Sequence, residues 1–305
     1  MAGYIFDFFG FKADDRSMAA RMYAYQKRCP FLGSQCTKVL SRDRTISGVC
    51  AVRQKTEGSP NVICCPIRMY ADNYKMLKDI SKLAFEKELN LYAGRVAVEK
   101  AKKEGGSIAV FGHGWGGELH LPQREGKGSY FCDWVLARLD DKGQLAEITA
   151  IEVQTIDTTG NYRDAREALL DDNREIVPDT VGLNWENVSK RIIPQLIYKG
   201  QVLQREEMCR AGLYFVCPLA VYNKVIGRLG GKEKLTKMPK QPASVHFVAY
   251  DYLNSTCKKG ENLPIGLIET HDTAVYKIQE AFSSISLPEE NVYEKAIIQS
   301  LYGMP

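Results

Sequence analysis

Two acidic residues and an amide lie in neighbouring apolar segments and could together serve a metal ion. Asp133 interrupts the apolar run 131–139, and Glu152 and Gln154 lie in the apolar run 148–156. Side chains alternate between the two faces of a β-strand, so Glu152 and Gln154 are expected to point the same way. A hard cation such as magnesium is usually held by one or two carboxylates together with water and phosphate oxygens. The pattern therefore predicts a metal-dependent nuclease.

The surroundings of Glu152 favour a compensating charge. Both faces of the segment 148–156 are otherwise apolar, which is typical of a central strand that is buried on both sides. An unpaired carboxylate there would cost several kcal/mol, and a divalent cation shared with Asp133 would remove that cost. The alternative is structural, with Asp133 capping a strand end and Glu152 paired with an arginine.

A second group of candidate metal ligands lies in the first quarter of the chain, which holds five of the nine cysteines. They are Cys29, Cys36, Cys50, Cys64 and Cys65. Proline directly follows Cys29 and Cys65 and restricts the local backbone, and nearby lysine or arginine would favour thiolates. Four thiolates in a tetrahedral site suit zinc or a single iron. The spacing is not the paired CxxC of zinc ribbons and fingers, so buried free cysteines are the alternative.

Composition and charge set the outer bounds. With 305 residues, 45% hydrophobic and 26% charged, the chain can form one large core or a core with an appended module, and fibrous and disordered classes are excluded. A net charge of +4 permits DNA binding without requiring it. There is no basic leader and no apolar run near the ~20 residues that a bilayer needs, so we expect a cytoplasmic protein without membrane contact. An odd number of cysteines then favours reduced thiols or metal ligands over disulfides.

The elements that must position these residues follow a mixed α/β pattern. Apolar residues at helical spacing predict helices over 72–89, 92–103, 187–205, 273–282 and 289–302. The third of these should kink at Pro194. Short apolar runs predict strands over 107–112, 131–139, 148–156, 211–217, 243–252 and 265–269. The Gly-rich stretch 112–121 lacks the lysine and hydroxyl of a P-loop, so we expect a turn there, with Glu118 as a candidate third acid.

Two further groups could contact DNA, although both are also typical of ordinary protein surface. The basic segment 228–240 could bind phosphates. Arginine and amide side chains that could reach base edges in the major groove are Arg163, Arg166, Asn173, Arg174, Asn184 and Asn187.

Several separated blocks of the sequence together match one known family. Beside the cysteines with their neighbours, the blocks are Gly116–Leu119, Asp133–Trp134, Ile151–Thr155, Asp157, Gly160–Tyr162, Lys190–Arg191, Gln195 and Tyr198–Lys199. In this order, from the N-terminus to about residue 200, they resemble the NotI family of type II restriction endonucleases. Each block alone is weak evidence, and the resemblance depends on their order together with the cysteines.

The resemblance implies a fold and a division of the chain. The fold is α/β with a PD-(D/E)xK restriction-endonuclease-like core, in which helices flank a mixed central sheet, and with a small N-terminal metal-binding module of four cysteines. Residues 1–70 would form that module, and residues 71–305 the nuclease domain with its DNA-recognition elements. The ligands of a structural iron, with zinc as the alternative metal, would be Cys29, Cys36, Cys50 and Cys65. Cys65 is preferred to Cys64 because proline follows it.

The same resemblance implies roles for the acids. Asp133 and Glu152 would hold a catalytic Mg²⁺, and Glu118 would be a further member of the site. Gln154 stands where most PD-(D/E)xK enzymes have lysine, and without a positive charge it would orient the attacking water by hydrogen bonding.

The implied activity is Mg²⁺-dependent hydrolysis of double-stranded DNA at a specific, GC-rich palindrome, leaving 5′-phosphate ends. A homodimer would match the two-fold symmetry of such a site, and a cognate DNA methyltransferase is expected in the same system. The alternatives are a structure-specific or repair nuclease on the same core, and a non-catalytic DNA-binding module.

Overall fold

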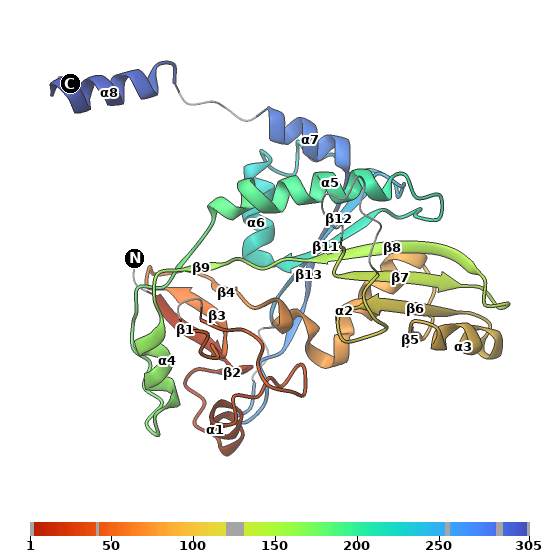
Figure 1. Ribbon diagram of the computed structural model, residues 1–305, viewed down its shortest axis with the longest axis horizontal. Helices are drawn as coiled ribbons and strands as arrows, with labels where there is room; N and C mark the ends of the chain where they lie inside the picture. The colour runs from red at the N-terminus through yellow and green to blue at the C-terminus, as the bar shows by residue number, and fades with distance from the viewer. Residues whose placement is uncertain (1–2, 41–42, 120–130, 254–256, 285–288, 304–305) are drawn as a thin grey trace.

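A seven-stranded mixed sheet carries both acid-bearing segments near its centre (Figure 1). The computed structural model of the chain describes residues 3–40, 43–119, 131–253, 257–284 and 289–303. The strand order is β13-β12-β11-β8-β7-β6-β5. The bounds are β5 Leu91–Ala93, β6 Ser107–Gly112, β7 Trp134–Leu139, β8 Leu145–Val153, β11 Leu213–Pro218, β12 Ser244–Tyr252 and β13 Ile265–Ala274. Strand β8 pairs antiparallel with β7 and parallel with β11, so the prediction of a central strand is confirmed.

Helices cover both faces of this sheet, as the predicted α/β class requires (Figure 1). On one face lie α5 (Ile193–Leu203), α6 (Leu219–Arg228) and α7 (Val275–Ser283), and on the other lies α2 (Ala71–Phe85). Strand β11 shows why the sheet is apolar on both sides: Phe215 packs with the first group of helices, and Tyr214 and Val216 pack on the side of α2. Helix α3 (Val96–Glu104) packs beside the edge formed by β5 and β6.

A four-stranded antiparallel sheet forms the N-terminal part of the molecule. Its order is β2-β1-β3-β4, with β1 Gly3–Phe8, β2 Phe11–Lys12, β3 Val49–Gln54 and β4 Asn61–Ile63. Helices α1 (Met18–Tyr25) and α4 (Arg163–Leu170) and the short β9–β10 pair (Thr158–Thr159, Gly182–Leu183) complete this part. The two largest hydrophobic clusters each contain residues from both sides of position 70. The division of the chain at that position therefore stays a prediction.

The observed boundaries differ from the predicted ones where tertiary pairing intervenes. Tyr92 was expected to open a helix, but it lies in β5, which pairs parallel with β6, and α3 begins only at Val96. The predicted kink at Pro194 takes the form of a π-helical turn, Val188–Ile192, directly before α5. Pro194 has no N–H to donate to the carbonyls of the preceding π-helical turn, where the regular helical hydrogen bonding is interrupted.

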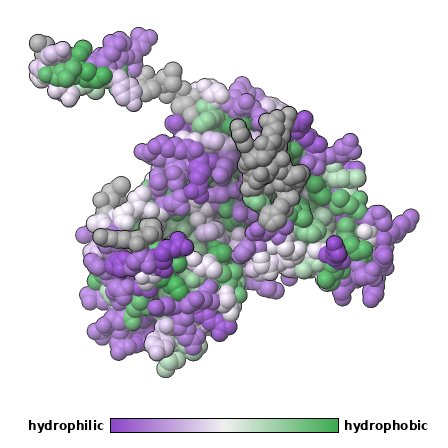
Figure 2. Space-filling model, in the orientation of Figure 1, coloured by the Kyte–Doolittle hydropathy of each residue, from purple (hydrophilic) through white to green (hydrophobic). Residues whose placement is uncertain are grey.

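The last helix, α8 (Val292–Tyr302), buries none of its residues. Figures 1 and 2 show it extended from the body of the protein. Its apolar side chains, among them Ile297 and Leu301, are exposed. Within the ranges that the structure describes, no helix is long and apolar enough to cross a bilayer.

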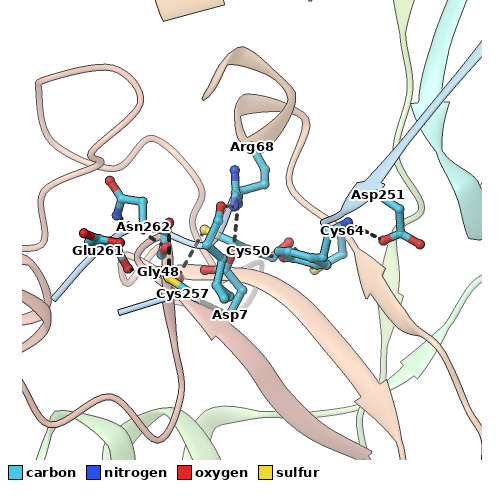
Figure 3. A network of polar contacts seen from close by, with 12 residues as sticks. Asp7, Gly48, Cys50, Cys64, Arg68, Asp251, Cys257, Glu261 and Asn262 are labelled. Carbon is cyan, nitrogen blue, oxygen red and sulfur yellow. Dashed lines mark hydrogen bonds and ion pairs between the residues drawn. The ribbon is translucent and has the colours of Figure 1, made fainter. Parts of the chain in front are cut away.

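A buried ion pair connects the N-terminal sheet to the far end of the chain (Figure 3). Nε of Arg68, which lies in the 3-10 turn Pro66–Tyr70, donates to Oδ2 of Asp7 in β1 at 2.8 Å, and both side chains are fully buried. The hydroxyl of Tyr252 in β12 donates to the same carboxylate oxygen at 2.9 Å. Arg68 also donates to the carbonyl of Leu263, and its guanidinium lies 4.5 Å from the ring centre of Phe31. One arginine thus joins four separate segments.

We expect Arg68→Met to lower the free energy of unfolding by roughly 3–5 kcal/mol, because it leaves the Asp7 carboxylate buried without its counter-charge. Urea denaturation measures this loss. Adding Asp7→Asn to the Arg68 variant should restore part of it. The control is Lys12→Met, which removes an exposed pair with Asp14 and should cost less than about 1 kcal/mol. Equal losses in the Arg68 and Lys12 variants would contradict this account.

Candidate active site

An open cleft of about 1200 Å³ lies between the N-terminal part and the end of β8. One wall includes Lys38, Cys64 and Tyr70, and the other comes from the end of β8 and the segment after it, between Val153 and Arg163. Asp133, Gln154 and Glu118 all line this cleft, so the structure brings these three predicted residues together. Glu152 lies just beneath the surface with 2% of its area exposed.

Asp133 lies directly before β7, at the end of β8. The antiparallel register pairs Trp134 with Ile151, which places Asp133 beside the last residues of β8. The backbone N–H of Val153 donates to Asp133 Oδ2 at 2.7 Å and fixes the carboxylate there. Asp133 therefore does cap a strand end, as the structural alternative supposed, and the same hydrogen bond holds it at the cleft.

Glu152 and Gln154 point to the same face of the sheet, as strand alternation predicted. Nε2 of Gln154 donates to Oε1 of Glu152 at 2.7 Å. The other carboxylate oxygen of Glu152 pairs with the ammonium group of Lys199 in α5. The structural alternative named an arginine as the partner of Glu152, but the partner is this lysine. In the sequence Lys199 was noted only within a family-like block, because nothing in its spacing relates it to a strand 47 residues earlier.

The charge of Glu152 acts on Asp133. Burial, together with the nearby charge of Glu152, raises the pKa of Asp133 to about 6, although the Val153 N–H and Lys199 act in the opposite direction. Glu118 raises it further. An ionised Asp133 is thus costly in the chain alone, and a bound cation would remove that cost.

Glu118 comes from the loop after β6. Its Oε1 lies 3.3 Å from Nδ1 of His113, which also lines the cleft, and both side chains are largely exposed to solvent. This loop carries an acid and an imidazole to the opening of the cleft. Its continuation, from residue 120 to residue 130, lies outside the described residues.

The cysteines divide between two places. One small pocket is lined by Cys29, Cys36, Cys50 and Cys65 together. Cys64 lines the cleft instead, where Nζ of Lys38 approaches its sulfur to 3.2 Å.

The thiols around the pocket interact. A hydrogen bond between Cys50 and Cys65 lowers the pKa of Cys65 to about 6 and raises that of Cys50. Burial raises the pKa of Cys29 to about 11. In the part of the chain that the structure describes, no three Cys, His, Asp or Glu side chains already have an arrangement that could hold a metal ion. The metal site therefore stays a prediction.

The family model described as restriction endonuclease NotI matches residues 14–211, more than half of the chain. The chain belongs to the NotI restriction endonuclease family. It is accordingly a type II site-specific deoxyribonuclease, and double-stranded DNA is the substrate of such an enzyme. The match to NotI includes every site residue discussed above, and the central mixed sheet with its flanking helices fits a nuclease-like core. No curated protein matches the chain.

The residues that were considered for base contacts in this NotI-family chain differ in their positions: some line the cleft and others are buried. Arg163 lines the cleft, together with Arg191 and Lys38. Arg166 and Arg174 are buried, and Nε of Arg166 donates to the carbonyl of Ile46 at 2.8 Å, so both were wrongly considered surface residues. The burial of an arginine side chain cannot be predicted from the neighbouring sequence, because it depends on carbonyl groups from distant loops.

The other candidates lie partly beside the cleft and partly away from it. Nδ2 of Asn187 donates to Asp157, a residue of the cleft wall, at 2.8 Å. In the basic segment 228–240, Lys232 pairs with Glu269 and Lys240 pairs with Glu86. These lysines form surface ion pairs away from the cleft.

Asp133→Asn should stabilise the metal-free protein at pH 8, by a few degrees in Tm. The folded-state pKa of Asp133, about 6, lies above the value near 4 of an unfolded chain. The contribution of Asp133 to the free energy of unfolding therefore falls as the pH rises from about 4 through 6. Thermal melts in EDTA at pH 5 and pH 8 should show a larger gain at pH 8. Asp172→Asn, at a fully exposed carboxylate, is the control; a gain at Asp133 no larger than this control would refute the assignment.

Proposed function

We propose that this NotI-family chain is a Mg²⁺-dependent restriction endonuclease whose active site is the cleft around Asp133, Glu152 and Gln154. One observation carries the proposal: the strand register places Asp133 beside Glu152, and Asp133 and Gln154 line a large open cleft. Their positions on neighbouring segments of a central mixed sheet support the PD-(D/E)xK arrangement of the core.

The residues present fit a hard cation. Asp133 and Glu152 would hold the ion, and two carboxylates with water and phosphate oxygens are the usual protein environment of Mg²⁺. A site of this kind needs no third protein ligand. When bound, the cation would polarise the scissile phosphate and lower the pKa of a water molecule.

The remaining steps belong to residues of the chain. The Val153 N–H holds Asp133, and the Gln154 amide holds Glu152, so both carboxylates are oriented before DNA arrives. The Gln154 amide would also hydrogen-bond the attacking water. Water adds to phosphorus in line as the bond to the 3′ oxygen breaks, and the product keeps a 5′ phosphate.

Three basic side chains of the cleft support a DNA-binding role. Lys38, Arg163 and Arg191 lie on its walls, where they could contact phosphates. Glu118, at the opening, is proposed as a further acid of the active site. A GC-rich palindrome as target, a homodimer that matches its symmetry, and a methyltransferase that protects it complete the proposal.

We also infer that Cys29, Cys36, Cys50 and Cys65 hold a structural metal, iron or alternatively zinc. Their positions around one pocket, and the low pKa of Cys65, suit a thiolate site. The pocket backs onto the cleft through Lys38, which lines both. The metal would therefore stabilise a wall of the cleft rather than take part in hydrolysis.

Cys50→Ser should lose the bound metal and lower Tm, because a structural site supplies folding energy. Elemental analysis of the purified protein gives the metal content per chain. Cys64→Ser is the matched control: it changes the neighbouring cysteine that faces the cleft and should retain the metal. Retention of metal by the Cys50 variant, or its loss from the Cys64 variant, would contradict the ligand assignment.

The function itself is tested by digesting fully sequenced, unmethylated phage DNA with and without Mg²⁺ and sequencing the fragment ends. We expect discrete ends at one repeated palindrome, and only with Mg²⁺. Asp133→Ala should abolish cleavage while DNA affinity in Ca²⁺ stays close to that of the wild type. Asp172→Ala, at an exposed site, should cleave normally.

Three outcomes would overturn parts of the proposal. Heterogeneous ends would favour a structure-specific nuclease. Binding without cleavage would favour a DNA-binding module. Full activity of the Asp133 variant would remove this residue from the active site.

A further inference from the structure

Both carboxylate oxygens of Glu152 already have a donor. Oε1 accepts from the Gln154 amide and Oε2 from the Lys199 ammonium group. Gln154 is neutral. Lys199 is therefore the contact that balances the charge of this buried acid.

The charge of Lys199 acts on both Glu152 and Asp133. Lys199 comes from α5, which packs on the face of the sheet to which Glu152 points, and only 16% of its side chain is exposed. Its charge also lowers the pKa of Asp133. The lysine thus joins the helix layer to Glu152 and lies close enough to Asp133 to act on it.

The basic residues of the cleft walls have other partners. Nζ of Lys38 donates to the carbonyls of Val49 and Cys64. Arg163 pairs with Asp43, and Arg191 pairs with Asp157. Within the described ranges, Lys199 is the cation that forms an ion pair with Glu152.

We propose that Lys199 is the mobile cation of this active site. It pairs with Glu152 and orients it while no metal is bound, and it turns to the scissile phosphate when the carboxylate holds Mg²⁺. The inference rests on the proposed function, because it assumes that Asp133 and Glu152 hold the metal. It assigns to a helix residue the positive charge that Gln154 cannot supply.

The chemistry of lysine suits both parts of this role. An ammonium group is a compact charge on a flexible four-carbon stem, so it can change partners without movement of α5. Lys199 and a metal ion are both positive, so they compete for Glu152. A released ammonium group beside the phosphate would stabilise the charge that develops there.

The first experiment measures stability without reference to activity. In EDTA at pH 8, Lys199→Met should lower Tm by several degrees, because Glu152 is left buried and unpaired. The double variant Glu152→Gln/Lys199→Met should recover most of that loss. Ca²⁺ should raise the Tm of Lys199→Met more than that of the wild type, since the competing charge is gone. Lys190→Met, at an exposed lysine that pairs with Glu186, is the matched control.

The second experiment measures single-turnover cleavage at saturating Mg²⁺ and DNA. A lysine that served only as a counter-ion would be replaced by Mg²⁺, and the rate would return to that of the wild type. A lysine that also contacts the phosphate predicts a loss of about 100-fold that added Mg²⁺ does not recover. DNA affinity in Ca²⁺ should change far less than the rate, and Lys190→Met should cleave normally.

The outcomes separate this inference from the proposed function. Wild-type protein that is neither stabilised by Ca²⁺ nor active with Mg²⁺ overturns both. If the wild type shows both responses, full activity of Lys199→Met at saturating Mg²⁺ overturns the role of Lys199 alone. If Lys199→Met and Lys190→Met have equal melting temperatures in EDTA, the role of Lys199 is overturned as well.

Discussion

A carboxylate buried at the centre of the main sheet determines the arrangement around it. Glu152 stands in β8 between two hydrogen-bonded neighbours and under a layer of helices, where an isolated charge would be strongly unfavourable. Gln154 from the same strand and Lys199 from α5 together satisfy its oxygens. The ion pair therefore joins α5 to β8 and brings a positive charge near Asp133. The contact that compensates a buried charge thus lies beside the residues of the proposed active site.

Sequence alone predicted the part of this arrangement that is local. Strand alternation placed Glu152 and Gln154 on one face, and the apolar surroundings indicated a central strand, which the sheet order confirms. Lys199 could not be found in this way, because its distance from Glu152 depends on how α5 packs rather than on any spacing along the chain. The same limit explains Arg166 and Arg174: nothing in their neighbours distinguishes a buried guanidinium from an exposed one. Tyr92 was placed in a helix because pairing with β6 is a tertiary event.

The N-terminal part illustrates how distant segments are combined. Cys29 and Cys36 follow α1, Cys50 lies in β3, and Cys65 precedes the turn that carries Arg68, yet these four side chains surround one pocket. Their clustering in the first quarter of the sequence indicated a common site, and the proline after Cys65 favoured it over Cys64; the place of Cys64 at the cleft required the fold. Asp7 and Arg68 then anchor this part to β12 through Tyr252. Hydrophobic clusters that extend across both sheets support the same connection.

The adjacent cysteines at the end of β4 have a mechanical consequence. Cys65 is extended, and successive side chains of an extended chain point to opposite sides. Cys65 accordingly faces the cysteine pocket and Cys64 faces the cleft, with one peptide unit between them. The peptide bond between them separates the cysteine pocket from the cleft. A chemical change at the sulfur of Cys65 would therefore also act on the backbone of Cys64, which forms part of the cleft surface.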